Sequence, residues 1–319
     1  MGSAIVANRR YLGMLLLLCA SCSIQGKSLD SLFESALSNF EFLPEYYTKF
    51  DLSTFAFHKN RYFKEQYLAE SNTGLEFMFL SYRQILYSVW DVKFKIGLGD
   101  IPGNNVFSVL NIYFNIVPTI ELRLPSVNIV AGYEHQCVHE VDRKNYPVIY
   151  YNAPFLAIGS KNMRVNEYWV PLAAEAGWKF KNRLGWYAAY VDYLKDGFGI
   201  VHPDKLNGYN AYSQEIRADG RYAFYRRKSW IFTVHQQLRL GHYDRTASVI
   251  DHGGIYWRED IGFESFFRRG KRGGALYCKY ILDDLPTIKG TIADASGVRP
   301  DLPVFSKDKL LEIGVSFFN

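Results

Sequence analysis

The sequence predicts an all-β protein, an antiparallel transmembrane β-barrel of about twelve strands with a short N-terminal helix. The first observation is that apolar and polar residues alternate along segments that begin near residue 53. The second is the aromatic content of 17%, with 24 Tyr and 23 Phe. Membrane barrels place such residues in two girdles at the lipid boundaries. The third is an export signal that is followed by no apolar run long enough for a membrane helix.

The N-terminal 22 residues have the parts of a secretory signal peptide. Arg9 and Arg10 supply the positive charge, the apolar run spans 11–19, and small residues follow it. This run is shorter than the roughly 20 residues that cross a bilayer as a helix. The segment 19–22 also resembles a bacterial lipobox. That resemblance implies acylation of Cys22, and simple cleavage of the signal peptide is the other interpretation.

A short amphipathic helix is predicted at 28–42, because its apolar residues recur at helical spacing. It belongs to a periplasmic N-terminal segment predicted at 23–52, before a barrel at 53–319. The strongest alternation marks seven strands, and weaker alternation marks others. The strong segments are 89–98, 110–124, 127–139, 168–180, 212–224, 230–240 and 255–267, and the weaker ones are 54–65, 74–84 and 273–283.

The connections between these segments alternate between short and long, as they do in outer-membrane barrels. Long connections are predicted at 140–166, 195–210, 242–253 and 284–308. The last strand, with Leu311, Ile313, Val315 and Phe317 on one face, resembles the terminal signal read by the barrel assembly machinery. We therefore expect a bacterial outer-membrane protein surrounded by outer-membrane lipids. Its N-terminus and its C-terminus are both expected on the periplasmic side. A soluble β-sandwich or soluble barrel is the alternative fold.

The residues predicted to face the lumen carry both signs of charge, which indicates paired networks in a closed or narrow interior. A wide porin needs about 16 strands or more. A narrow selective channel is therefore an open alternative, whereas a general pore is disfavoured. The net charge of +5 is spread along the chain, so no nucleic-acid partner is expected. The predicted lumen network consists of Glu215, Arg217, Asp219, Arg221, Arg258, Asp260 and Glu264.

One short stretch carries groups that can do chemistry. On the strand predicted at 127–139, Tyr133, His135, Cys137 and His139 continue the lipid-facing side of the alternation. Polar groups on a lipid-facing surface are costly and therefore need an explanation. A thiol on the same strand face as an imidazole can lose its proton and attack an ester.

The segment 132–137, Gly-Tyr-Glu-His-Gln-Cys, resembles the His-Gln-Ser motif of outer-membrane phospholipase A and of lipid A deacylase barrels. The resemblance implies Cys137 as nucleophile and His135 as base, with Tyr133 and His139 flanking the substrate. It also implies calcium and a homodimer. Val138 and His139 replace the Asn-Gly that follows in the family. The residue that orients the histidine is left open among Asn145, Asn152, Glu140 and Asp142.

Three other interpretations stay open. His135, Cys137 and His139 are also a chemically suitable set for zinc or copper, although we expect no metal and no cofactor. They are also explained as interfacial residues with Cys137 as a small apolar filler. The leading statement is therefore a barrel without assigned activity, with a lipid hydrolase and a narrow channel as alternatives. The segment Gly270–Gly274 resembles a phosphate loop only in composition, and is interpreted as a basic periplasmic turn.

Overall fold

A computed structural model describes residues 39–44, 46–57, 67–99, 108–140, 148–160, 184–192, 194, 199–202, 205–207, 212–243, 254–269, 272–282, 291–294, 297–303 and 309–319. The chain divides into two units, Met1–Glu41 and Phe42–Asn319, and the barrel belongs to the second. The predicted signal peptide, Cys22 and positions 28–38 of the predicted helix lie outside the described residues. Its last positions form strand β1 (Phe40–Phe42) instead of a helix. No described helix is long and apolar enough to cross a membrane.

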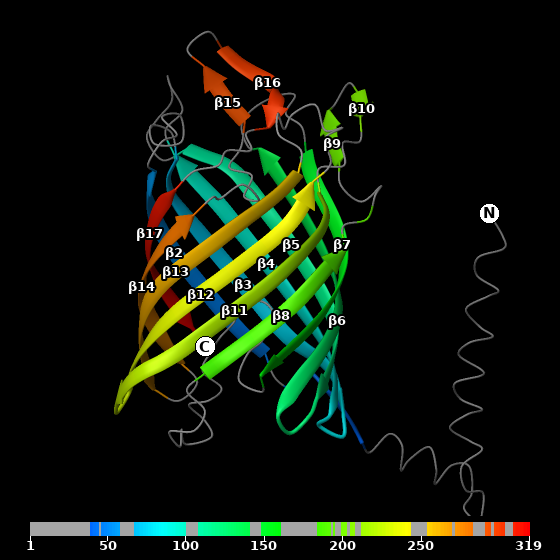
Figure 1. Cartoon of the computed structure of the whole chain (residues 1–319), viewed down its shortest axis with the longest axis vertical. Helices are drawn as coiled ribbons and strands as arrows, with labels where there is room; N and C mark the ends of the chain where they lie inside the picture. The colour runs from blue at the N-terminus through cyan, green and yellow to red at the C-terminus, as the bar shows by residue number, and fades with distance from the viewer. Residues whose placement is uncertain are drawn as a thin grey trace, which may run out of the picture. The chain divides into compact units, whose positions relative to one another are not determined.

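Twelve of the described strands form one closed antiparallel barrel, which confirms the predicted fold class (Figure 1). Each strand pairs with the next, β7 pairs with β8, and β17 pairs with β2. Closure leaves no free edge, so backbone groups within the sheet pair with one another rather than face lipid. The strands are β2 (Tyr46–Phe57), β3 (Tyr67–Tyr82), β4 (Leu86–Gly99), β5 (Ser108–Arg123), β6 (Val127–Glu140), β7 (Val148–Ser160), β8 (Leu184–Asp192), β11 (Tyr212–Arg227), β12 (Trp230–Tyr243), β13 (Gly254–Arg269), β14 (Arg272–Leu282) and β17 (Leu310–Phe318).

Besides β1, four short described strands lie outside this ring of twelve. β9 (Gly199–His202) pairs with the first residues of β7, and β10 (Lys205–Asn207) pairs with β9. β15 (Thr291–Asp294) and β16 (Gly297–Pro303) form a separate two-stranded sheet. The sheet therefore extends beyond the barrel at β7, beside the end of β6.

The structure corrects one strand assignment. The predicted long loop 140–166 contains β7, which takes the barrel position between β6 and β8 that was assigned to 168–180. The segment 168–180 itself lies outside the described residues. The inward side chains of β7 are Ala153, Phe155 and Ala157, so this strand carries no charged lumen face for the alternation to reveal. At the start of the barrel, β2 begins at Tyr46 rather than near residue 54.

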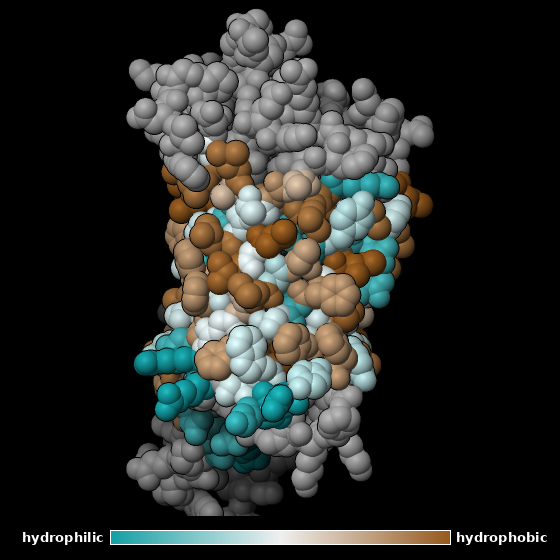
Figure 2. All heavy atoms as spheres, turned by 90° about the vertical axis from the view of Figure 1, so that its left-hand side faces the viewer, coloured by the Kyte–Doolittle hydropathy of each residue, from teal (hydrophilic) through white to brown (hydrophobic). Residues whose placement is uncertain are grey.

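The two faces of the barrel differ sharply in polarity. On β4, Trp90 and Phe94 point outward and are 40% and 43% exposed, whereas Asp91 between them is fully buried inside. Figure 2 shows apolar residues gathered across the middle of one face of the described surface, called here the apolar belt. Apolar side chains outside and charged side chains inside are the arrangement of a barrel that spans a membrane.

The two ends of the barrel also differ. Short turns at 83–85, 124–126 and 228–229 lie at one end, called here the turn end, and the other is the loop end. Arg83 and Gln84 adopt left-handed backbone angles, with φ of 51° and 53°, which tighten the first of these turns. The barrel starts with β2 and finishes with β17 at the turn end, as the strand parity predicts.

Candidate functional site

The candidate site lies on the outside of β6, toward the loop end. Burial alternates along this strand, with Asn128, Val130 and Glu134 buried inside. Because side chains alternate in a strand, His135, Cys137 and His139 share the outward face. Cys137 is partly exposed there, two residues from His135, so the two α-carbons are roughly 6–7 Å apart.

Asn152 of β7 lies beside His135 and contacts its ring. The two residues are directly paired between β6 and β7, and Nδ1 of His135 lies 2.7 Å from Oδ1 of Asn152. An amide oxygen can only accept a hydrogen bond, so Nδ1 donates the proton in this contact. This tautomer leaves Nε2 as the proton acceptor of the neutral ring. The backbone oxygen of Asn152 accepts a 3.0 Å hydrogen bond from the amide of Leu194, which helps to hold the strand in place.

Three other residues, Asn145, Glu140 and Asp142, were open as partners that orient His135. Asn145 and Asp142 lie outside the described residues, and only the backbone of Glu140 is described. Asn152 is therefore the one of the four that the structure brings to the imidazole.

His139 and Tyr133 flank the pair along the same face. The ring of His139 packs edge-on against Phe114 of β5 at 5.4 Å, and Phe114 packs against Phe94 of β4 at 4.8 Å. Tyr133 is 38% exposed and pairs with Pro154 on β7. The pair is thus bordered by an aromatic, lipid-facing surface.

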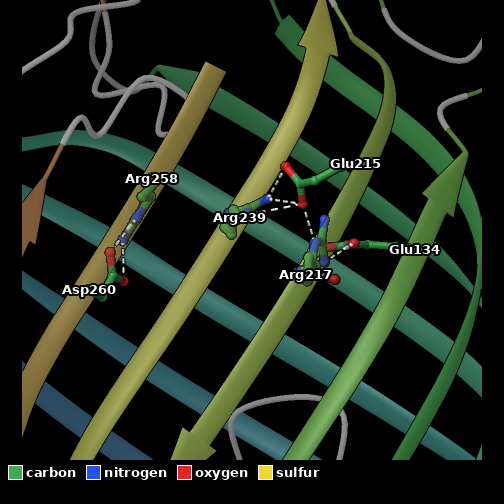
Figure 3. A network of polar contacts seen from close by, with 7 residues as sticks. Glu134, Glu215, Arg217, Arg239, Arg258 and Asp260 are labelled. Atoms are coloured by element: carbon green, nitrogen blue, oxygen red, sulfur yellow. Dashed lines mark hydrogen bonds and ion pairs between the residues drawn. The ribbon is translucent and has the colours of Figure 1, made fainter. Parts of the chain in front are cut away.

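The strand that carries the site is held from inside the barrel by Glu134. Its carboxylate lies 2.9 Å from Nη1 of Arg217 on β11 and accepts a 3.1 Å hydrogen bond from Asn115 on β5. β6 and β11 are not neighbours, so the contact with Arg217 crosses the lumen (Figure 3). Glu215 binds the same arginine, and Arg239 binds Glu215 at 2.9 Å. A second internal contact fixes β6, because Gly132 leaves space for the ring of Phe155.

The remaining residues of the predicted lumen network also face inward. Arg258 lies 2.7 Å from Asp260, and Arg221 lies 3.4 Å from Glu264. Asp219 lies 2.8 Å from Nε2 of His235. Within the predicted network, Glu215 contacts Arg217, Arg221 contacts Asp219 and Glu264, and Arg258 contacts Asp260.

Sequence reasoning missed several polar residues. Glu134 and Arg239 belong to the network around Arg217, and their inward positions follow from the parity of β6 and β12. Gln236 and Glu259 were also missed. They face outward on β12 and β13 within the apolar belt, where Nε2 of Gln236 donates a 2.7 Å hydrogen bond to Glu259. The outward position of Glu259 could have been predicted, because Glu259 lies between Trp257 and Ile261 in the alternate residues that face lipid on β13.

The described residues do not supply a metal site. No group of three or more His, Cys, Asp and Glu side chains among them could hold a metal ion. His135, Cys137 and His139 are all described, so they do not form the zinc or copper set considered above. The described part of the barrel therefore contains no set of side chains to which a calcium ion can be assigned.

No family model and no curated protein matches this chain. Among solved structures it is similar to the KdgM porin, with a TM-score of 0.40, 8% identity and coverage of 84% of this chain and 98% of the porin. It is similar to the calcium-bound dimer of outer membrane phospholipase from Salmonella typhi, with a TM-score of 0.41, 8% identity and coverage of 86% of this chain and 90% of the phospholipase. It is also similar to LpxR from Salmonella typhimurium, with a TM-score of 0.38, 6% identity and coverage of 85% of this chain and 99% of LpxR. The likeness at these values is one of barrel architecture alone.

Proposed function

We propose that this barrel, which spans the bacterial outer membrane, hydrolyses an acyl ester of a membrane lipid on its outer surface. The observation that carries the proposal is the 2.7 Å contact between His135 and Asn152, on the same outward face as Cys137. A nucleophile, a base and a group that orients the base are the three parts of an activated nucleophile. Their place on the lipid-facing side means that a lipid reaches them without entering the lumen.

In the proposed reaction, Nε2 of His135 takes the thiol proton of Cys137, and the thiolate attacks the ester carbonyl. The tetrahedral intermediate then collapses and the alkoxide of the lipid leaves. Protonated His135 gives this alkoxide the proton that it took from the thiol. This leaves a thioester on Cys137. Water then attacks the thioester with His135 as base, which releases the fatty acid and restores the thiol. Asn152 keeps the imidazole in one tautomer throughout.

The surroundings suit a lipid substrate with long acyl chains. Tyr133 and His139 border the reacting pair, and the aromatic pair Phe94 and Phe114 continues into the apolar belt. The substrate class is therefore a phospholipid or lipid A, whose acyl chains lie along the barrel wall while the ester meets Cys137. The homodimer and the calcium ion that the resemblance implies stay predictions.

A narrow channel is the competing function. The ion pair between Glu134 on β6 and Arg217 on β11 joins strands that are separated by β7 and β8, and the pair of Arg239 with Glu215 adds bulky charged groups beside it, which narrows the lumen at that level. A channel would show conductance that changes in Arg217→Ala or Asp260→Ala. The hydrolase proposal instead expects Asp260→Ala to keep its hydrolytic activity, because Asp260 lies inside the barrel on β13 and pairs with Arg258 rather than with the residues that hold β6.

The test compares Cys137→Ala and His135→Ala with the matched control Cys278→Ala, which removes the exposed outward cysteine on β14. Each barrel is assayed for fatty acid release from phospholipid and lipid A in mixed micelles. We expect Cys137→Ala and His135→Ala to lose activity by roughly 10³-fold or more, and Cys278→Ala to keep it. Cys137→Ser is expected to retain measurable activity, since a hydroxyl can replace the thiol. Folded wild-type barrel without activity on either lipid, or full activity in Cys137→Ala, contradicts the proposal.

A further inference from the structure

Two neighbouring hairpins carry a concentrated positive charge at the turn end. In the first hairpin, β11 ends with Arg226 and Arg227, and Lys228 follows in the turn to β12. In the second, Arg269 ends β13 and Arg272 begins β14. These five residues, called here the basic sector, are all exposed. β12 pairs with β13 along its whole length, so the two hairpins are adjacent. No Asp or Glu occurs in 225–232 or 265–275 of the sequence.

An aromatic cluster lies next to the basic sector on the outer wall. The ring of Trp230 lies tilted against Phe267 at 5.2 Å and stacked on Phe232 at 6.4 Å, and Tyr225 packs against Phe232 at 5.7 Å. A register shift between Ala223 and Tyr225 leaves the consecutive rings Phe224 and Tyr225 both exposed. Aromatic rings of this kind sit at the level of lipid headgroups. Figure 2 shows hydrophilic residues gathered at the same lower margin of the apolar belt.

The other short turns lack this charge. The turn between β5 and β6 is Leu124-Pro125-Ser126, which has no ionisable side chain. The turn between β3 and β4 has one, Arg83, which lies 5.2 Å over the ring of Tyr82. Among the short turns that the structure describes, the positive charge is therefore concentrated at the hairpins β11–β12 and β13–β14.

We propose that the basic sector binds the phosphate groups of anionic phospholipids in the leaflet that faces the turn end. Guanidinium groups bind phosphate oxygens through two parallel hydrogen bonds, and basic residues at a membrane surface attract anionic lipid. The lipid source is favoured over free phosphate because the aromatic cluster places these cations at headgroup level. The proposal rests on the membrane location and is independent of the chemistry at Cys137.

The experiment titrates the purified full barrel in detergent with phosphatidylglycerol or phosphatidylcholine and counts bound lipids by native mass spectrometry. We expect phosphatidylglycerol to bind about tenfold more tightly than phosphatidylcholine. The variant R226Q/R227Q/K228Q/R269Q/R272Q is expected to bind the two lipids within about twofold of each other. R226K/R227K/R269K/R272K keeps the charge and should keep the preference. Arg83→Gln, on the isolated turn, is the matched control.

Folding of each variant is checked by circular dichroism and by the heat-dependent shift in electrophoretic mobility. Equal binding of the two lipids by wild-type barrel would overturn the proposal, and so would an undiminished preference in the folded five-residue glutamine variant. Inorganic phosphate is added against sodium chloride at matched ionic strength. Displacement of the lipid by phosphate alone would mean a free-phosphate site and overturn the lipid assignment.

Discussion

Two polar pairs on the described lipid-facing surface of this barrel have the same distance between their polar atoms. His135 and Asn152 join β6 to β7 at 2.7 Å, and Gln236 and Glu259 join β12 to β13 at the same distance. The pairs differ in their neighbours. Beside the first lies Cys137, the proposed nucleophile, whereas Leu238, Trp257 and Ile261 surround the second. Under the proposed function, the thiol beside the first pair distinguishes the two, because both pairs contain a lipid-facing hydrogen bond.

The pairs differ also in what lies behind them. Behind the first pair stands Glu134, whose ion pair with Arg217 joins β6 to the non-neighbouring strand β11. Behind the second pair, Gln237 donates a hydrogen bond to Asp219 on the adjacent strand β11. The first pair therefore sits on a wall that is braced from inside by a non-neighbouring strand. Variants of the two regions should consequently separate a functional polar pair from a merely tolerated one.

The largest expected effect comes from removing the brace. Glu134→Ala leaves part of the charge of Arg217 and the amide of Asn115 without their partner inside the barrel, so we expect a loss of about 3 kcal/mol in the free energy of unfolding. Denaturant unfolding of the barrel in detergent micelles measures it. Hydrolysis should fall as well, since β6 loses its fixed position. An unchanged denaturant midpoint of unfolding would show that the contact between Glu134 and Arg217 contributes little to the stability of the barrel.

Next in size is the loss of the orienting amide. Asn152→Ala should lower kcat/KM for lipid hydrolysis roughly 10²-fold, because the ring of His135 loses its fixed tautomer. Gln236→Ala, which removes the corresponding amide on β12, should leave kcat/KM unchanged. If both variants behave alike, the proposed distinction between the two pairs is wrong.

A smaller effect is expected at Gly132, which lies inside the barrel behind the site. A Cβ at this position would lie 2.4 Å from the ring of Phe155 and 2.8 Å from Thr119. Gly132→Ala should therefore destabilise the barrel by about 1–2 kcal/mol, as overpacking does. The double variant Gly132→Ala, Phe155→Leu should recover part of this loss in the same unfolding measurement. No recovery would place the strain elsewhere.

The smallest effect is a gain in stability at the second pair. Replacing both partners, Gln236→Leu with Glu259→Leu, removes polar atoms from the lipid-facing wall without orphaning either one. We expect the free energy of unfolding to rise by about 1 kcal/mol. The barrel should keep its hydrolytic activity. A clear loss of stability would mean that this pair, too, holds the wall together.

Much of the barrel could be predicted, because most strands alternate charged and apolar residues. Asp91 and Lys93 against Trp90 and Phe94 reveal both faces of β4 directly. β7 could not be found in this way, since Ala153, Phe155 and Ala157 make its inner face as apolar as its outer one. Its inner face is filled by packing against Gly132 rather than by ion pairs, and packing of this kind leaves no periodic signal.

The candidate site was predictable only as far as one strand reaches. That His135 and Cys137 share a face follows from the two-residue period alone. The partner of His135 depends on the register between β6 and β7, which joins it to Asn152 and does not follow from the alternation along β6 alone. The contact between Glu134 and Arg217 depends on barrel closure, which brings distant strands to the same level of the lumen.

Closure through β2 and β17 has a kinetic consequence. Leu310 pairs with Phe57 and Phe318 with Lys49, so the seam joins the first and last strands of the barrel to be synthesised. Contacts between such distant segments form slowly, because a long loop must be ordered before they can add stability. Until the last strand arrives, two open edges are available for pairing with other chains. Export must therefore deliver the whole polypeptide before the sheet can seal, and truncation at the C-terminus leaves a species prone to aggregate.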